Sequence, residues 1–292
     1  MFQSFDWNLL ALQAFSDQAP NFVAVEKDSY VAILPIVVHN GALVFAGGPL
    51  FDYRDAICAG DPSALEAALE TASSFGLPLS IAGVRGMAAA ARWSRLSPQP
   101  WTAAPFVSRQ LITPEAFAAK HTRSRRALRR LNDLGVQIKT MKGTPGAMER
   151  ILRSKAGEPA GWGVNLFRDE RCIEFMRSVV ALPNTRCDLF VLEVAEQPIA
   201  ALVTFVDQGV RRFYTTWMDA AWNKHSPGIA LLFETTRLTL EGGLDCDYMT
   251  GEQPYKLRFA TGSEPLYKVE ASVGQLSALK RETREPIELK AA

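Results

Sequence analysis

The clearest hydrophobic pattern in this chain consists of three apolar segments in its C-terminal half. Short polar turns at 196–198 and 207–209 separate them. Strands joined by such short turns must be antiparallel neighbours. The pattern therefore predicts a three-stranded meander, with strands over 188–194, 199–206 and 210–218.

A helix and one more strand follow this meander. Apolar residues at Ile229, Leu232 and Phe233 share one face of a helix predicted over 227–241, and Gly242-Gly243 ends it. The apolar segment 244–249 predicts the next strand. Because it returns after a helical crossover, we expect it to lie parallel to a strand of the meander.

The rest of the chain also mixes strands and helices, which predicts an α/β protein with mixed sheets. Thr113-Pro114-Glu115 is a typical helix start, and the helix it begins is predicted to run to Leu134 and stop at Gly135. This helix marks the predicted domain boundary, so the chain divides into 1–112 and 113–292. Each half is expected to contain a mostly antiparallel sheet flanked by helices.

Composition changes this picture little. The chain has 292 residues, 32 basic and 31 acidic, so a net charge near +1 gives no general attraction to nucleic acid or membrane. Its four cysteines lie far apart without a CxxC pair, which disfavours a metal site and a disulfide framework. No apolar run is long enough to span a bilayer. We therefore expect a cytoplasmic protein that needs no metal.

The start of the predicted helix 227–241 is a candidate anion site. Its first N–H groups, on Gly228 and Ile229, lack partners within the helix and lie at the positive end of the helix dipole. Ser226 precedes them, and the third meander strand ends just upstream. The strand residues that are candidates to line a donor channel here are Tyr214, Thr216, Trp217 and Met218.

A polar motif, Gly251 to Lys256, follows the strand 244–249 at the edge where open α/β sheets bind ligands. Glu252 is the candidate general base and Tyr255 the candidate acid. Lys256 offers a charge for an anionic substrate. The alternative is that Glu252 and Lys256 form only a solvated i,i+4 pair.

Further candidates surround these two segments. His225 is a second candidate base or a phosphate contact, and Asp219 a candidate substrate contact. Trp162 and Arg168 lie in the predicted long loop 155–168, where they either line an acceptor pocket or anchor the loop.

A basic run occupies the predicted helix 113–134. It includes Arg123, Arg126 and Arg130, which share one stripe of the helix. The stripe either binds an anionic acceptor, such as a sugar nucleotide or lipid phosphate, or is a solvated surface. A tRNA partner would need a broader basic surface than this composition suggests.

The segment Trp217 to Phe259 resembles the CelD-like branch of the GNAT N-acyltransferases, which is related to the Fem-type peptidyltransferases. The residues that carry the resemblance are Ser226-Pro227-Gly228, Leu231-Leu232, Gly242-Gly243, Leu244 to Asp247, Gly251-Glu252 and Tyr255-Lys256. It implies two GNAT-like halves packed together, one competent site and an acyl-CoA donor.

The resemblance implies transfer of an acyl group from acyl-CoA to an amine by direct attack, on a sugar or lipid precursor of the cell envelope. Peripheral membrane contact fits such an acceptor. Two alternatives stay open: an aminoacyl-tRNA donor, as in Fem-type enzymes, and a non-catalytic binding module. The binding module stays open because the segment Trp222 to Gly228 stands where many GNAT enzymes have an Arg/Gln-x-x-Gly-x-Gly/Ala pyrophosphate loop. Pro227 in this segment has no N–H to donate.

Overall fold

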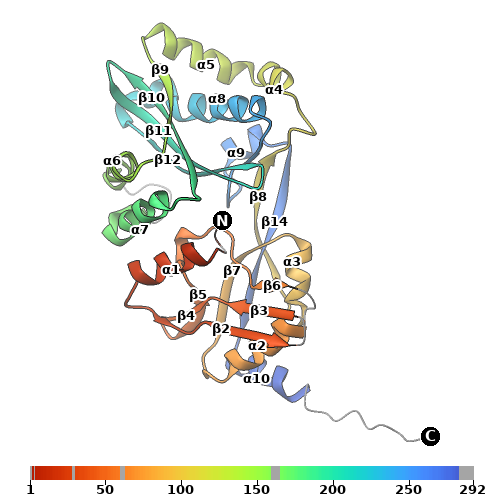
Figure 1. Cartoon of the computed structure of the whole chain (residues 1–292). Coiled ribbons are helices and arrows are strands. Elements are labelled where there is room, and N and C mark those ends of the chain that lie inside the picture. The colour runs from red at the N-terminus through yellow and green to blue at the C-terminus, as the bar shows by residue number, and fades with distance from the viewer. Residues whose placement is uncertain (1, 3, 28–29, 60–62, 159–164, 283–292) are drawn as a thin grey trace, which may run out of the picture. The chain divides into compact units, whose positions relative to one another are not determined.

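The computed structural model describes residues 2, 4–27, 30–59, 63–158 and 165–282. Its chain forms two compact units (Figure 1). The first comprises Met1–Thr102 and Pro265–Ala292, and the second Ala103–Glu264. The predicted α/β class with mostly antiparallel mixed sheets is confirmed.

The predicted division into 1–112 and 113–292 differs from these units at both ends. The segment from Pro265 onward belongs to the first unit, because β14 (Gly262–Ala271) pairs antiparallel with β7 (Leu79–Arg85). A strand contributed from the far end of the chain gives no local sequence signal of the sheet it joins.

The first unit contains two sheets. One has the order β1-β4-β5-β7-β14, in which only the β5–β7 pair is parallel, and the other is the antiparallel sheet β2-β3-β6. Its other strands are β1 (Ala19–Pro20), β2 (Val23–Lys27), β3 (Tyr30–Leu34), β4 (Ile36–His39), β5 (Ala42–Phe45) and β6 (Ile57–Ala59). Its α-helices are α1 (Phe5–Ala14), α2 (Ser63–Ser73), α3 (Met87–Arg92) and α10 (Val273–Glu282).

The second unit contains the predicted meander. Its strand order is β8-β13-β12-β11-β10-β9, and β12–β13 is its parallel pair. The strands are β8 (Gln99–Val107), β9 (Gln137–Lys142), β10 (Arg186–Val194), β11 (Gln197–Asp207), β12 (Val210–Met218) and β13 (Asp245–Asp247). The meander and the parallel return strand are therefore confirmed.

Helices cover both faces of the sheet in the second unit (Figure 1). α8 (Pro227–Glu241) packs on one face beside α4 (Pro114–Lys120) and α5 (Thr122–Asp133). α6 (Pro145–Ala156) and α7 (Glu170–Ala181) lie on the other face. The rings of Phe117 and Phe233 stack with their centroids 5.7 Å apart, which joins α4 to α8.

One local prediction in this unit is wrong. The single helix expected over 113–134 is broken at His121 into α4 and α5, because the His121 ring is buried between Phe117 and Phe259, with centroids 4.5 and 4.9 Å away. Within the polar motif after β13, a further helix, α9 (Pro254–Phe259), begins at its proline.

The parallel pair β12–β13 is short. It joins Val210, Arg211 and Arg212 to Asp245, Cys246 and Asp247, respectively. At its end the Nη1 of Arg212 donates to Oδ2 of Asp247 over 2.8 Å, and the Asp247 side chain is 1% exposed. Asp247 also accepts a hydrogen bond from the Met249 N–H, so this carboxylate fixes both the strand pair and the following turn.

Asp247→Ala should lower the free energy of unfolding by about 3 kcal/mol, because it leaves the Arg212 guanidinium largely buried without its main partner. Glu241→Ala, which breaks an exposed ion pair with Arg237, should cost less than about 1 kcal/mol. Urea unfolding of both variants measures the difference. Equal losses would show that the Arg212–Asp247 pair has no special place in the fold.

His121 makes stability depend on pH. Burial, followed by the positive charges of Lys120 and Arg258, lowers the pKa of His121 from 6.5 to about 4. Between these pH values the unfolded state therefore binds more protons than the folded state. The contribution of neutral His121 to the free energy of unfolding is fully present above pH 6.5 and is lost as the pH falls toward 4.

We expect a loss of roughly 3 kcal/mol across this window in the wild-type protein. His121→Leu should make the stability profile flatter between pH 6.5 and 4, whereas His39→Leu, at an exposed histidine of the first unit, should not. Urea unfolding at several pH values tests this. An unchanged slope in His121→Leu would contradict a buried neutral imidazole.

Candidate functional site

The β12–β13 pair opens into a fork. No strand of the described chain pairs with β12 on this side beyond Arg212, although β12 continues to Met218 and stays paired with β11 on its other side. A β-bulge places Tyr214 between the paired residues Phe213 and Thr215. Bulges of this kind bend a strand and raise its local twist.

Backbone groups of β12 point into this fork. The Asp219 N–H donates to the Ile199 carbonyl of β11, so the Met218 N–H one residue earlier faces away from β11. It donates to Oε1 of Glu158 over 3.4 Å, and the other Glu158 oxygen accepts from Lys155 over 2.7 Å. The end of β12 thus presents an N–H group that already holds a carboxylate.

The N-terminus of α8 lies next to the end of β12 at Met218. Its N-cap residue Ser226 is left-handed, with φ 55° and ψ 49°, and its side chain makes no capping bond. The N–H groups of Gly228 and Ile229 donate to no described residue. A Cβ at Gly228 would lie 3.3 Å from Sδ of Met218, so glycine lets β12 and the first turn of α8 approach closely.

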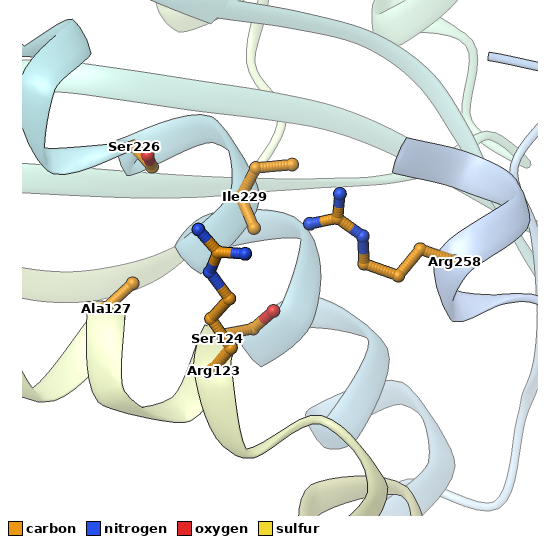
Figure 2. A pocket seen from close by; sticks show the side chains of 6 residues that line it. All are labelled: Arg123, Ser124, Ala127, Ser226, Ile229 and Arg258. Atoms are coloured by element: carbon orange, nitrogen blue, oxygen red, sulfur yellow. The ribbon is translucent and has the colours of Figure 1, made fainter. Parts of the chain in front are cut away.

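A cavity of about 160 Å³ adjoins this helix end (Figure 2). Its walls come from α5, from the first turn of α8 and from α9. The lining residues are Arg123, Ser124, Ala127, Ser226, Ile229 and Arg258. Ser226 and Ile229, predicted donor contacts, therefore lie beside Arg123, a predicted acceptor contact.

The cavity has a positive lining. Arg123 and Arg258 extend their guanidinium groups toward it, and neither makes an ion pair or hydrogen bond with any described residue. The Ser124 side chain, in a residue that is 4% exposed, also lacks a hydrogen-bond partner within the described part of the chain. The field reaches His121, whose pKa Arg258 helps to lower.

The predicted chemical residues lie on the turn after β13 and on α9. Glu252 is exposed, and Lys256 donates to the Thr250 carbonyl over 2.7 Å, which ties α9 to the turn. Tyr255 is 37% exposed, and burial raises the pKa of its phenol. The phenol is therefore protonated at neutral pH and able to donate a proton.

Other predicted site residues have local roles in the structure. Asp219 caps the 3-10 helix Ala220–His225 by accepting from the Ala221 N–H, and the His225 ring lies 5.4 Å from that of Trp222. Arg168 donates to the main-chain carbonyl of Glu158 over 2.9 Å and so anchors the chain there.

The remaining candidates are not brought into the cavity. Thr216 and Trp217 are half-buried on β12, Tyr214 packs edge-on against Phe205 at 5.5 Å, and Arg126 is exposed on α5 outside the cavity lining. Trp162 lies outside the described residues.

Sequence reasoning missed Arg258, Ser124 and Glu158. Arg258 stands three residues after Tyr255 on α9, so recognising Pro254 as a helix start would have placed both on one face. Ser124 and Glu158 carry no local signal, because only the packing of α5 on α8 and the end of α6 near β12 give them their neighbours.

Comparison with known proteins identifies the domain. Residues 118–257 match the family model described as acetyltransferase (GNAT) domain, and this range holds α5, α8, β12, β13 and most of α9. A search of curated proteins found no significant match to the chain.

Solved structures share the fold at low sequence identity. The C-terminal DUF2156 domain of a protein described as a lysylphosphatidylglycerol synthetase from Agrobacterium fabrum has TM-score 0.62 and 12% identity, covering 97% of this chain and 93% of that one. The L-PGS structure from Bacillus licheniformis has TM-score 0.60 and 12% identity, with 94% and 92% covered. FemX has TM-score 0.57 and 10% identity, with 93% and 90% covered.

These matches cover nearly the whole of each chain, so the shared fold includes both units. The family match covers the fork, the start of α8 and the polar motif at the start of α9. Residues 118–257 therefore form a GNAT acetyltransferase domain, and the protein is an acyltransferase.

Proposed function

We propose that this protein is an N-acyltransferase that moves an acyl group from acyl-CoA to an amine of a cell-envelope sugar or lipid precursor. The observation that carries the proposal is the fork beyond Arg212, which opens onto an uncapped helix N-terminus. We assign it to the CelD-like branch and place the reaction in the cytoplasm. No helix of the described chain is long and apolar enough to cross a membrane.

The donor lies along β12 in this proposal. Its diphosphate takes hydrogen bonds from the N–H groups of Gly228 and Ile229, and its pantetheine arm runs along the free edge of β12. The Met218 N–H exchanges its long hydrogen bond with Glu158 for one with the donor. Pro227 at the first helical position does not weaken this site, because the two following N–H groups are the ones that face the anion.

The chemistry is a direct attack. The acceptor amine forms a bond to the thioester carbonyl carbon, and a β12 N–H stabilises the negative charge on the oxygen. Glu252 takes the amine proton. The carbon–sulfur bond breaks, and the Tyr255 hydroxyl gives its proton to the departing thiolate. Lys256 and Arg126, which is exposed on α5, are proposed to attract an anionic acceptor.

A second candidate uses the same site with an aminoacyl-tRNA donor. Two observations favour it: the fold shared with FemX and with a lysylphosphatidylglycerol synthetase domain, and the exposed arginines along α5. In this version the tRNA backbone crosses α5, and an amino acid takes the place of the acyl group.

Calorimetry with CoA, acetyl-CoA and a long-chain acyl-CoA tests the donor. We expect saturable binding of at least one of them, because the α8 N–H groups and the neighbouring arginines attract phosphates. Absence of binding by all three at millimolar concentration, together with binding of an aminoacyl-tRNA mimic, would replace the first candidate by the second.

Glu252→Gln should lower kcat by roughly a hundredfold with little effect on donor binding, because the amide keeps the shape of the carboxylate but cannot accept the amine proton. Glu241→Gln, on the exposed end of α8, is the matched control and should keep normal kcat.

Thiol release from the donor, followed in steady state, measures both variants. A normal kcat in Glu252→Gln would remove Glu252 from the mechanism and make His225 the leading base.

A further inference from the structure

The cavity beside α8 brings together polar groups from two helices that do not belong to the fork. Arg123 and Ser124 come from α5, and Arg258 comes from α9. Figure 2 shows the two guanidinium groups reaching toward the same space, with the Ser124 hydroxyl directed to the gap between them. The first turn of α8 forms the remaining wall through Ser226 and Ile229.

The charges in this cavity are not balanced. Two guanidinium groups line it, no acidic side chain does, and neither arginine pairs with a described carboxylate. Like charges that share a small space repel, and guanidinium groups are the side chains best suited to bind phosphate through paired N–H donors. The Ser124 hydroxyl, in a residue that is 4% exposed, adds a further donor that bonds to no described residue.

We propose that this cavity binds a phosphate monoester dianion, supplied by the 3′-phosphate of CoA. The inference rests on the proposed acyl-CoA donor. A monoester at pH 7 carries a charge between about −1.5 and −2 and three strong acceptor oxygens. Two guanidinium groups and one hydroxyl match that charge and those oxygens.

The other phosphates of the candidate donors fit the cavity less well. The diphosphate of CoA is proposed to face the Gly228 and Ile229 N–H groups, outside the pair of arginines. The backbone phosphates of a tRNA are diesters with one charge each. Arg123 and Arg258 would thus make the enzyme select CoA over dephospho-CoA and over an RNA-linked donor.

The first test compares CoA with dephospho-CoA, which differs only by the 3′-phosphate. The wild-type protein should bind CoA roughly tenfold or more tightly, a typical effect for charge-assisted hydrogen bonds. The double variant Arg123→Gln/Arg258→Gln should lose this preference and bind dephospho-CoA as the wild type does. Arg125→Gln, which changes an arginine of the same helix outside the cavity, should keep it.

A second test uses adenosine 3′,5′-bisphosphate and adenosine 5′-monophosphate, so that it does not depend on the pantetheine site. The bisphosphate should bind more tightly than the monophosphate in the wild type and not in the double variant. Bound phosphate should also raise the pKa of His121, followed by NMR, because it offsets the charge of Arg258. The Arg125→Gln protein should show the same rise.

These outcomes separate the inference from the donor assignment. Equal binding of CoA and dephospho-CoA by the wild type overturns the 3′-phosphate assignment and leaves the acyl-CoA donor in place. If no CoA species binds, the donor assignment fails, and binding of adenosine 3′,5′-bisphosphate then tests the monoester site by itself. Its arginine-dependent binding would support a monoester site, and its failure to bind would overturn that site too.

Discussion

The short parallel pairing between β12 and β13 is the constraint on which the second unit depends. It ends at Arg212 and Asp247, whose buried ion pair fixes the point where the strands separate. Directly after it, the Tyr248 hydroxyl and the Thr236 hydroxyl of α8 form a 2.8 Å hydrogen bond. The helix is therefore held against the strand that forms one side of the fork. Removing either charge alone would therefore destabilise the strand pair, the turn after β13 and the packing of α8 at the same time.

The proposed anion site at the start of α8 lies where the helix lacks a side-chain cap. Ser226 adopts a left-handed conformation without capping the helix, and the cavity beside it gathers two arginines with no described counter-charge. Unpaired helix N–H groups and neighbouring like charges are unfavourable. The proposed anion would compensate both features at once. His121 adapts to this field by remaining neutral, which is also why its burial beside Phe117 and Phe259 is tolerated.

In the proposed mechanism, the helix α9 links ligand binding to chemistry. Its six residues carry the Tyr255 phenol and the Arg258 guanidinium three positions apart, and Lys256 ties it to the carbonyl of Thr250. Because the turn before it is pinned by Asp247, the position of α9 follows from the strand pair. Glu252 lies in the segment between this turn and α9, and α9 brings Arg258 to the cavity, so the proposed roles of Glu252, Tyr255 and Arg258 all depend on the same turn.

The sequence alone determined the meander, the helix from Pro227 and the parallel return strand. Apolar segments, short turns, a proline at the start of a helix and glycines at its end are all local signals. The sequence also singled out the α8 N-terminus, where Ser226 and Ile229 do line a cavity. Tertiary structure decided the rest. Burial of His121 broke a helix that its sequence favours, and β14 joined the first unit across the length of the chain. Arg123 and Arg258 lie 135 positions apart, so only the packing of α5 and α9 around α8 could bring their charges into one cavity.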